Sequence, residues 1–219
     1  MSPTASRTAI SAVAVFILLL LAAHLLKPDL APSWHFISEY AIGPYGWVMQ
    51  AAFWALAIAN VATFFAIRQA MQTIGGRVGS FLFLAGTAGL VLAAIFVTDP
   101  INTPPEAQTT SGKLHNLGGG LGLLGFIGTL VFSVRLLRHE HWKPARLAVL
   151  AATILLVLGF LVSFVSIIMI AIDHKGVFGP DTPIGWPNRI GIGSGCAWLV
   201  IVAWQARLIA LQSKEVSES

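Results

Sequence analysis

Side chains that could do acid–base chemistry are gathered in a few short polar segments of this 219-residue chain. The segment Trp34–Tyr40 contains His35, Ser38 and Glu39. If residues His35–Tyr40 form a short helix, these three side chains share one face, because residues three and four positions apart are neighbours on a helix. That face would present a base, a hydroxyl group and a carboxylate, which together suit acid–base chemistry.

Asp99 and His115 bracket a second polar segment, and its closure would bring them together. A carboxylate hydrogen-bonded to an imidazole orients the ring for use as a general base or a metal ligand. We therefore expect Asp99 and His115 to meet, with Ser38 and Glu39 nearby, and these four are the candidate catalytic residues. The same pairing also suits a structural clamp, because a polar group beside hydrocarbon is costly to leave unpaired.

A metal shell is a second interpretation of these polar segments. His35, His115, Asp99 and His174 supply nitrogen and oxygen atoms of the kind that zinc takes as ligands. Their spacing matches neither a His-Glu-x-x-His helix nor a Gly-x-Ser-x-Gly elbow. The pattern therefore leaves the cofactor unassigned.

Six apolar runs must position these polar segments. Each approaches or exceeds the roughly 20 residues that a helix needs to cross about 30 Å of hydrocarbon. The runs cover residues 10–26, 47–67, 78–98, 115–134, 147–172 and 190–206. Only 10% of the residues are charged, against about 25% in a soluble domain. The sequence predicts an all-α fold: a polytopic transmembrane bundle of six spans, one domain over residues 1–219, with three outward-facing hairpins.

Lysine and arginine are divided unevenly between alternate connections. One side holds nine: Arg7, Arg68, Arg77, Arg135, Arg138, Lys143, Arg146, Arg207 and Lys214. The other side holds four: Lys27, Lys113, Lys175 and Arg189. The positive-inside rule assigns the richer set to the cytoplasm. This predicts a multi-pass protein of the cell (inner) membrane with both termini cytoplasmic.

The charge pattern also bears on partners. The formal net charge is +4, but the basic residues lie in short connections, so the expected partner is the lipid bilayer and not nucleic acid. The runs have no Asp, Glu, Lys or Arg deep inside them, which argues against ion-coupled transport. Glycines in 78–98, 115–134 and 190–206 predict close packing of the third, fourth and sixth spans. Gly122 is an expected contact residue.

The polar motifs resemble a known membrane family. They are Ile37–Trp47 (ISEYAIGPYGW), Thr98–Pro100, and Gly112–His115 followed by Gly119. Their order resembles the family known as domain of unknown function 998, and more distantly the six-span Frag1/DRAM group, some of whose members are linked to lipid or GPI-anchor processing. The resemblance implies a multi-pass membrane protein without an agreed activity. It covers the candidate positions Ser38, Glu39, Asp99 and His115 and assigns a role to none of them.

Three classes of function fit these observations. The first is a lipid-handling or hydrolytic membrane enzyme with a polar site at the outer mouth of the bundle, where a lipid or small molecule would bind. The second is a small-molecule transporter, which needs a polar path through the spans. The third is a non-catalytic sensor or assembly protein, in which the polar residues only brace the outer loops. The sequence predicts neither the substrate nor the oligomeric state.

Overall fold

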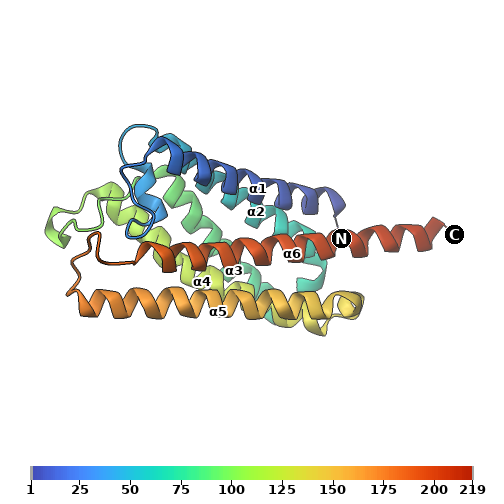
Figure 1. The fold of residues 1–219 in the computed structure, drawn as a ribbon. Coiled ribbons are helices and arrows are strands. Elements are labelled where there is room, and N and C mark those ends of the chain that lie inside the picture. Colours follow the sequence, from blue (N-terminus) through green and yellow to red (C-terminus); the bar gives the residue numbers. More distant parts are fainter. Residues whose placement is uncertain (1, 219) are drawn as a thin grey trace.

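The computed structural model describes the backbone of residues 2–218 and the side chains of residues 2–212. Lys214, which was counted in the cytoplasmic set, lies outside the described side chains. Six long helices run side by side (Figure 1): α1 (Pro3–Leu26), α2 (Gly46–Ile67), α3 (Ile74–Ile95), α4 (Thr110–Arg138), α5 (Arg146–Asp173) and α6 (Gly185–Glu218). All six are long and apolar enough to cross a membrane, which confirms the predicted all-α bundle.

Some helices begin before the apolar runs because polar residues cap them. The Ser2 side chain accepts a hydrogen bond from the N–H of Ala5, so α1 begins at Pro3. The Thr109 side chain accepts from the N–H of Gly112, so α4 begins about a turn ahead of its apolar run. A capping side chain extends each helix into sequence whose composition is that of a loop.

The connections alternate between the two ends of the bundle (Figure 1). Residues 27–45, 96–109 and 174–184 form the loop-rich end, which includes the 3₁₀ helices η1 (Ile37–Ala41) and η3 (Pro105–Ala107). The opposite, basic end carries η2 (Arg68–Met71) and η4 (Glu140–Ala145). The short helix expected over His35–Tyr40 is only partly present: η1 contains Ser38 and Glu39 but begins at Ile37, so His35 lies outside it.

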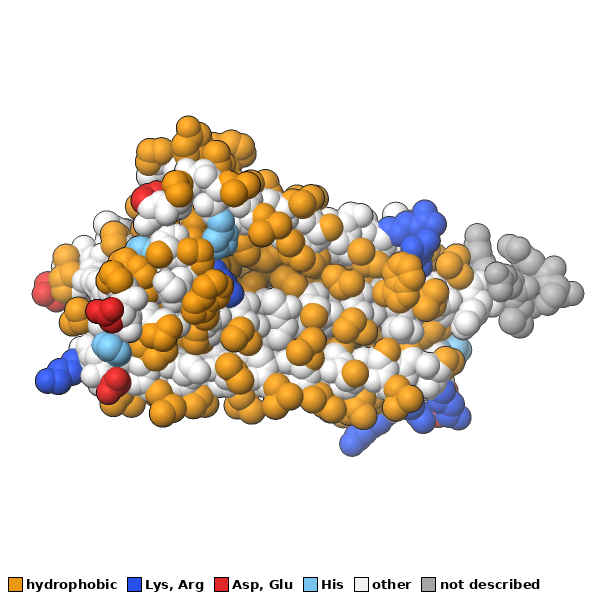
Figure 2. Space-filling model, in the orientation of Figure 1, with side chains coloured by type: hydrophobic (Ala, Val, Ile, Leu, Met, Phe, Trp, Pro, Cys, Tyr) orange, Lys and Arg blue, Asp and Glu red, His pale blue; other side chains and the backbone are white. Residues whose placement is uncertain are grey.

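The side chains at the surface form three zones (Figure 2). Lysine and arginine gather mainly at the basic end, acidic residues gather mainly at the loop-rich end, and apolar side chains cover the length between them. Leu18 and Phe81, for example, are 65% and 72% exposed. A chain in water would bury such side chains, whereas a helix in lipid presents them outward.

Glycines set the closest helix–helix contacts. A Cβ atom on Gly86 of α3 would lie 2.3 Å from the Cα of Gly125 in α4, and one on Gly89 would lie 2.4 Å from the carbonyl oxygen of Gly118. Close packing of the third and fourth spans is therefore confirmed. The expectation for Gly122 was wrong: a Cβ there would have open space around it, because this residue faces away from α3.

Helix α6 packs differently from the prediction. Its tight contacts are with α5, where a Cβ on Gly159 would lie 2.4 Å from Ser194, and one on Gly191 would lie 2.8 Å from Ser163. Its tie to α4 is a polar one, a hydrogen bond of 3.0 Å from the indole N–H of Trp198 to the Ser133 hydroxyl. The glycines thus form two close helix pairs, α3 with α4 and α5 with α6.

Candidate functional site

Glu39 joins two of the three connections at the loop-rich end. Its side chain lies in η1 and is almost fully buried. One carboxylate oxygen accepts hydrogen bonds from Nδ1 of His35 at 3.2 Å and from the N–H of Phe36 at 3.0 Å. The other accepts from the N–H of Ile101 at 3.0 Å. His35 and Glu39, which were predicted to share one face, are in contact, and the bond from Ile101 to Glu39 joins residues 27–45 to residues 96–109.

Further hydrogen bonds bring in the third connection. The N–H of Ile37 donates to the Asn188 side chain at 3.1 Å, which ties η1 to the start of α6. Asn102 donates to the carbonyl oxygen of Phe178 at 2.7 Å and accepts from its N–H at 2.9 Å. The three connections therefore form one hydrogen-bonded cap over this end of the helices.

Tyr40 and Lys27 are buried within this cap. The Tyr40 hydroxyl donates to the carbonyl oxygen of Leu30 at 2.6 Å, and burial raises the pKa of Tyr40, with an opposing effect from Arg189. The Lys27 ammonium donates to the carbonyl oxygens of Tyr40 and Ile42. Burial lowers the pKa of Lys27, and Asp29 partly offsets that effect.

Asp99 holds Thr109, the N-cap residue of helix α4. Its carboxylate accepts from the N–H and from the hydroxyl of Thr109, both at 2.9 Å. A Cβ on Gly112 would lie 2.0 Å from an Asp99 oxygen, so this position of α4 has no room for a side chain. Asp99 thus fixes the direction in which α4 enters the bundle.

His115 lies on α4, about one turn after Gly112, and is 8% exposed. Its Nδ1 is 2.9 Å from the carbonyl oxygen of Phe96. Because a carbonyl oxygen can only accept, Nδ1 carries a proton, and in the neutral ring Nε2 keeps a lone pair. The expected hydrogen bond between Asp99 and His115 is not formed, since both groups bond other residues that flank the same connection.

The four predicted metal ligands have separate surroundings. His35 bonds Glu39, Asp99 bonds Thr109, and His115 bonds a backbone carbonyl. His174 is half-buried, and its ring lies 3.7 Å from an oxygen of the exposed Asp173. Within the described residues, no three His, Cys, Asp or Glu side chains are grouped so that they could hold a metal ion.

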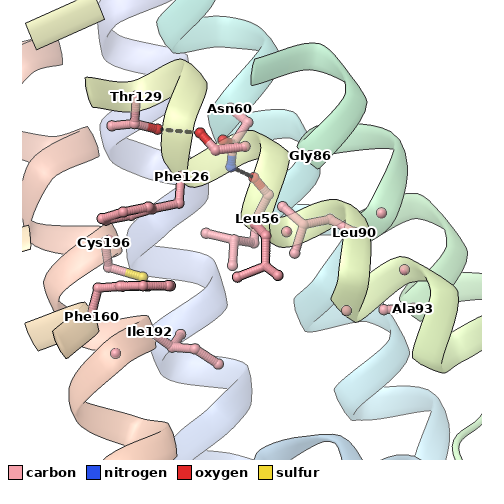
Figure 3. A pocket seen from close by; sticks show the side chains of 18 of the residues that line it. Leu56, Asn60, Gly86, Leu90, Ala93, Phe126, Thr129, Phe160, Ile192 and Cys196 are labelled. Atoms are coloured by element: carbon pink, nitrogen blue, oxygen red, sulfur yellow. Dashed lines mark hydrogen bonds between the residues drawn. The ribbon is translucent and has the colours of Figure 1, made fainter. Parts of the chain in front are cut away.

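A cavity of about 500 Å³ lies between the helices next to the cap. Residues from η1 and from helices α2 to α6 line it. Figure 3 shows Leu56, Leu90, Phe126 and Phe160 around this space. The Phe126 and Phe160 rings stack 3.8 Å apart, where α4 meets α5. Most of the wall is therefore apolar, and its volume is that of a site for a drug-sized or lipid-like molecule.

None of the polar groups that line the cavity carries a fixed charge. They are Ser38, Asn60, His115, Thr129, Ser163 and Asn188. Ser38 of η1 and His115 of α4, both predicted site residues, therefore line the same space. Among the described residues, neither the Ser38 hydroxyl nor Nε2 of His115 has a hydrogen-bond partner within the protein. Both are available to a ligand.

Helix α4 makes room for this cavity. Gly119 and Gly122 line it, and a Cβ at either position would have no heavy atom within 4 Å. Gly118 and Gly125 also line it while packing against α3. The glycines of α4 therefore serve two faces, one that contacts α3 and one that leaves space beside α5 and α6.

Comparison with known proteins decides the family. The model of a family described as protein of unknown function (DUF998) matches residues 10–205. The chain belongs to the DUF998 family. Together with the six apolar helices, this identifies a multi-pass membrane protein whose environment is the lipid bilayer. No curated protein and no solved structure matches the chain. The distant likeness to the Frag1/DRAM group stays a prediction.

Two contributors to this DUF998 site were not among the predicted site residues. Asn188 orients the backbone beside Ser38, and Arg189 holds several groups of the cap. Their signal was their position at the start of the last apolar run. Gly119 and Gly122 were interpreted as packing residues, because composition alone does not show which face of a helix meets a neighbour.

Proposed function

We propose that this DUF998 protein binds a neutral amphiphile, such as a monoacylglycerol, in the cavity beside α4. The observation that carries this proposal is the lining: an apolar wall with uncharged hydrogen-bonding groups and no Lys, Arg, Asp or Glu. Such a wall favours a hydrocarbon chain, whereas an ionised headgroup would lose its hydration without a counter-charge. The proposal thus refines the lipid-handling interpretation of the sequence.

In this proposal the predicted residues divide into two roles. His115 and Ser38 hold the polar end of the ligand, because both line the cavity and have unused hydrogen-bonding capacity. Glu39 and Asp99 act as braces, because their oxygens are occupied by groups of the cap. This division requires no metal ion.

Ester hydrolysis is the second candidate, and the shared lining by Ser38 and His115 favours it. The Ser38 oxygen would attack the ester carbonyl while Nε2 of His115 takes the hydroxyl proton. The leaving alcohol would take that proton as the ester bond breaks. Water would then release the fatty acid from Ser38 and restore the hydroxyl group.

Filling the cavity should abolish ligand binding. We expect a monoacylglycerol with a diazirine in its acyl chain to crosslink to α4 and α6 of the purified protein in detergent. Gly119→Leu combined with Gly122→Leu adds two side chains at positions that line the cavity and have open space around the Cβ atom. Labelling should fall by about tenfold or more, which corresponds to about 1.4 kcal/mol of binding free energy. Peptide mass spectrometry measures the labelled sites.

The matched control is Gly120→Leu. Gly120 also has open space around its Cβ position but does not line the cavity, so labelling should stay at the wild-type level. Equal labelling of the double variant and the wild type would refute the cavity as the binding site. Fatty acid released from the probe by the wild type, and lost in Ser38→Ala and His115→Gln, would establish hydrolysis; binding without release would limit the function to lipid handling.

We also propose that the loop-rich end faces outward from the cell membrane and that both termini are cytoplasmic. The asymmetry of Lys and Arg supports this orientation. Single cysteines at exposed Glu106 and Gln72 test it in a Cys196→Ser background. An impermeant maleimide should label Glu106→Cys on intact cells, and Gln72→Cys only after permeabilisation. The reverse pattern would invert the orientation.

A further inference from the structure

We propose that a groove between α1 and α6 binds one anionic phospholipid, with its phosphate on Arg189 and one acyl chain along the groove. This site is separate from the cavity and does not depend on the function proposed for it. The lining of the groove, the contacts of Arg189 and the depth of Arg189 along the helices support this site.

The groove has a volume of about 410 Å³ and an apolar lining. Phe16, Ile17 and Leu20 line it from α1, and Gly193 and Val200 are among its lining residues from α6. Ile17 and Gly193 are both exposed, so the groove is open to the surroundings of the bundle. In a bilayer those surroundings are acyl chains, and an open apolar groove between two helices suits one of them.

Arg189 is the one charged residue among those lining the groove. The residues that the structure describes give its guanidinium no ion pair. The Glu39 carboxylate attracts the guanidinium electrostatically but is not hydrogen-bonded to it. The Glu39 oxygens already accept from His35, Phe36 and Ile101. The head of the groove therefore carries a positive charge without a bonded anion.

One edge of this guanidinium is poorly satisfied. Nη1 donates to the carbonyl oxygens of His35 and Gly185 at 2.8 and 3.0 Å. On the other edge, Nε and Nη2 both approach a single nitrogen, Nε2 of His24, at 3.3 and 3.1 Å, and Nη2 lies 3.4 Å from the Tyr40 hydroxyl. These distances exceed the 2.7–2.9 Å or so of charge-assisted bonds. Two parallel N–H groups on one edge match two phosphate oxygens.

The position of Arg189 suits a lipid headgroup. Trp186 lies just under one turn earlier on α6 and is 53% exposed, and its ring lies 6.0 Å from the Arg189 guanidinium carbon. Exposed tryptophans gather where hydrocarbon meets headgroups, and Trp47 at the start of α2 is exposed to a similar extent. Arg189 thus lies close to the level of the lipid phosphates, with the groove running from it into the hydrocarbon.

Lipid retention tests this site. We expect native mass spectrometry of the protein, released from micelles containing equal amounts of phosphatidylglycerol and phosphatidylcholine, to show one retained phosphatidylglycerol. Gly193→Leu fills the groove, since a Cβ there has open space around it. Arg189→Gln removes the charge. Each should lower the retained phosphatidylglycerol by about tenfold or more, whereas Arg77→Gln at the basic end should leave it unchanged.

The outcomes separate the alternatives. If Arg189→Gln fails to fold because of its contacts with the cap, Gly193→Leu still decides the question. Equal retention of the two phospholipids, or full retention by Gly193→Leu, would overturn the proposal. Displacement of the lipid by inorganic phosphate alone would show that Arg189 binds the anion without the groove, which also overturns it. Gly119→Leu with Gly122→Leu should keep this lipid, because neither glycine lines the groove.

Discussion

Gly86→Leu is expected to destabilise the protein more than any other single glycine substitution between α3 and α4. Even the first added carbon would lie 2.3 Å from the Cα and 2.8 Å from the N of Gly125. Both atoms belong to the backbone, which cannot rotate away as a side chain would, so α3 and α4 must separate. Overpacking usually costs about 1–3 kcal/mol, and we expect a loss at the upper end of that range or beyond it. Thermal unfolding in detergent measures the loss.

Gly120→Leu provides the control for this substitution. It adds the same side chain to the neighbouring helix, where a Cβ has no heavy atom within 4 Å. Since leucine favours helix over glycine by up to about 1 kcal/mol, this variant should unfold at or above the wild-type temperature. Equal unfolding temperatures for Gly86→Leu and the wild type would mean that α3 and α4 are not in backbone contact.

Glu39→Ala is expected to have the second large effect. It would leave three donors, those of His35, Phe36 and Ile101, without their acceptor; the His35 contact is buried and the other two are partly buried. Each unsatisfied donor costs roughly 1–3 kcal/mol, so the expected loss in unfolding free energy is about 3 kcal/mol or more. The connection 96–109 should also be cleaved faster by protease, because its tie to η1 is removed.

Two variants sharpen the Glu39 test. Glu39→Gln keeps one acceptor oxygen and should lose less stability than Glu39→Ala. Glu106→Ala removes an exposed carboxylate from the same end of the bundle and should change neither stability nor cleavage. Wild-type stability and cleavage in Glu39→Ala, together with loss of lipid labelling, would assign Glu39 to the ligand and not to the cap.

The six helices could be predicted because their signal is local. About 20 successive apolar residues identify a span without any knowledge of its neighbours. The starts of α1 and α4 were missed because they depend on the caps Ser2 and Thr109, which lie in polar sequence. The pairing of helices was only partly predictable. Gly122 and Gly125 are the same residue type in the same apolar run, and they differ only in the face of α4 on which they lie.

The candidate site was predicted as a set of residues but not as a geometry. Ser38, Glu39, Asp99 and His115 all lie near the loop-rich end, as the order of the spans requires. The structure pairs three of them with backbone groups, and such pairings leave no trace in the sequence because every residue has the same carbonyl and, proline apart, the same N–H. The Phe96 carbonyl that holds His115 is an example.

The uncharged lining of the cavity has a consequence for the electrical behaviour of the protein. A membrane potential of about 100 mV acts on each elementary charge that crosses the bilayer with about 2.3 kcal/mol. With His115 neutral, the described residues around the cavity bring no formal charge into that field. A neutral amphiphile could therefore enter, turn over or leave without electrical work, and energised and de-energised membranes would fill the cavity equally.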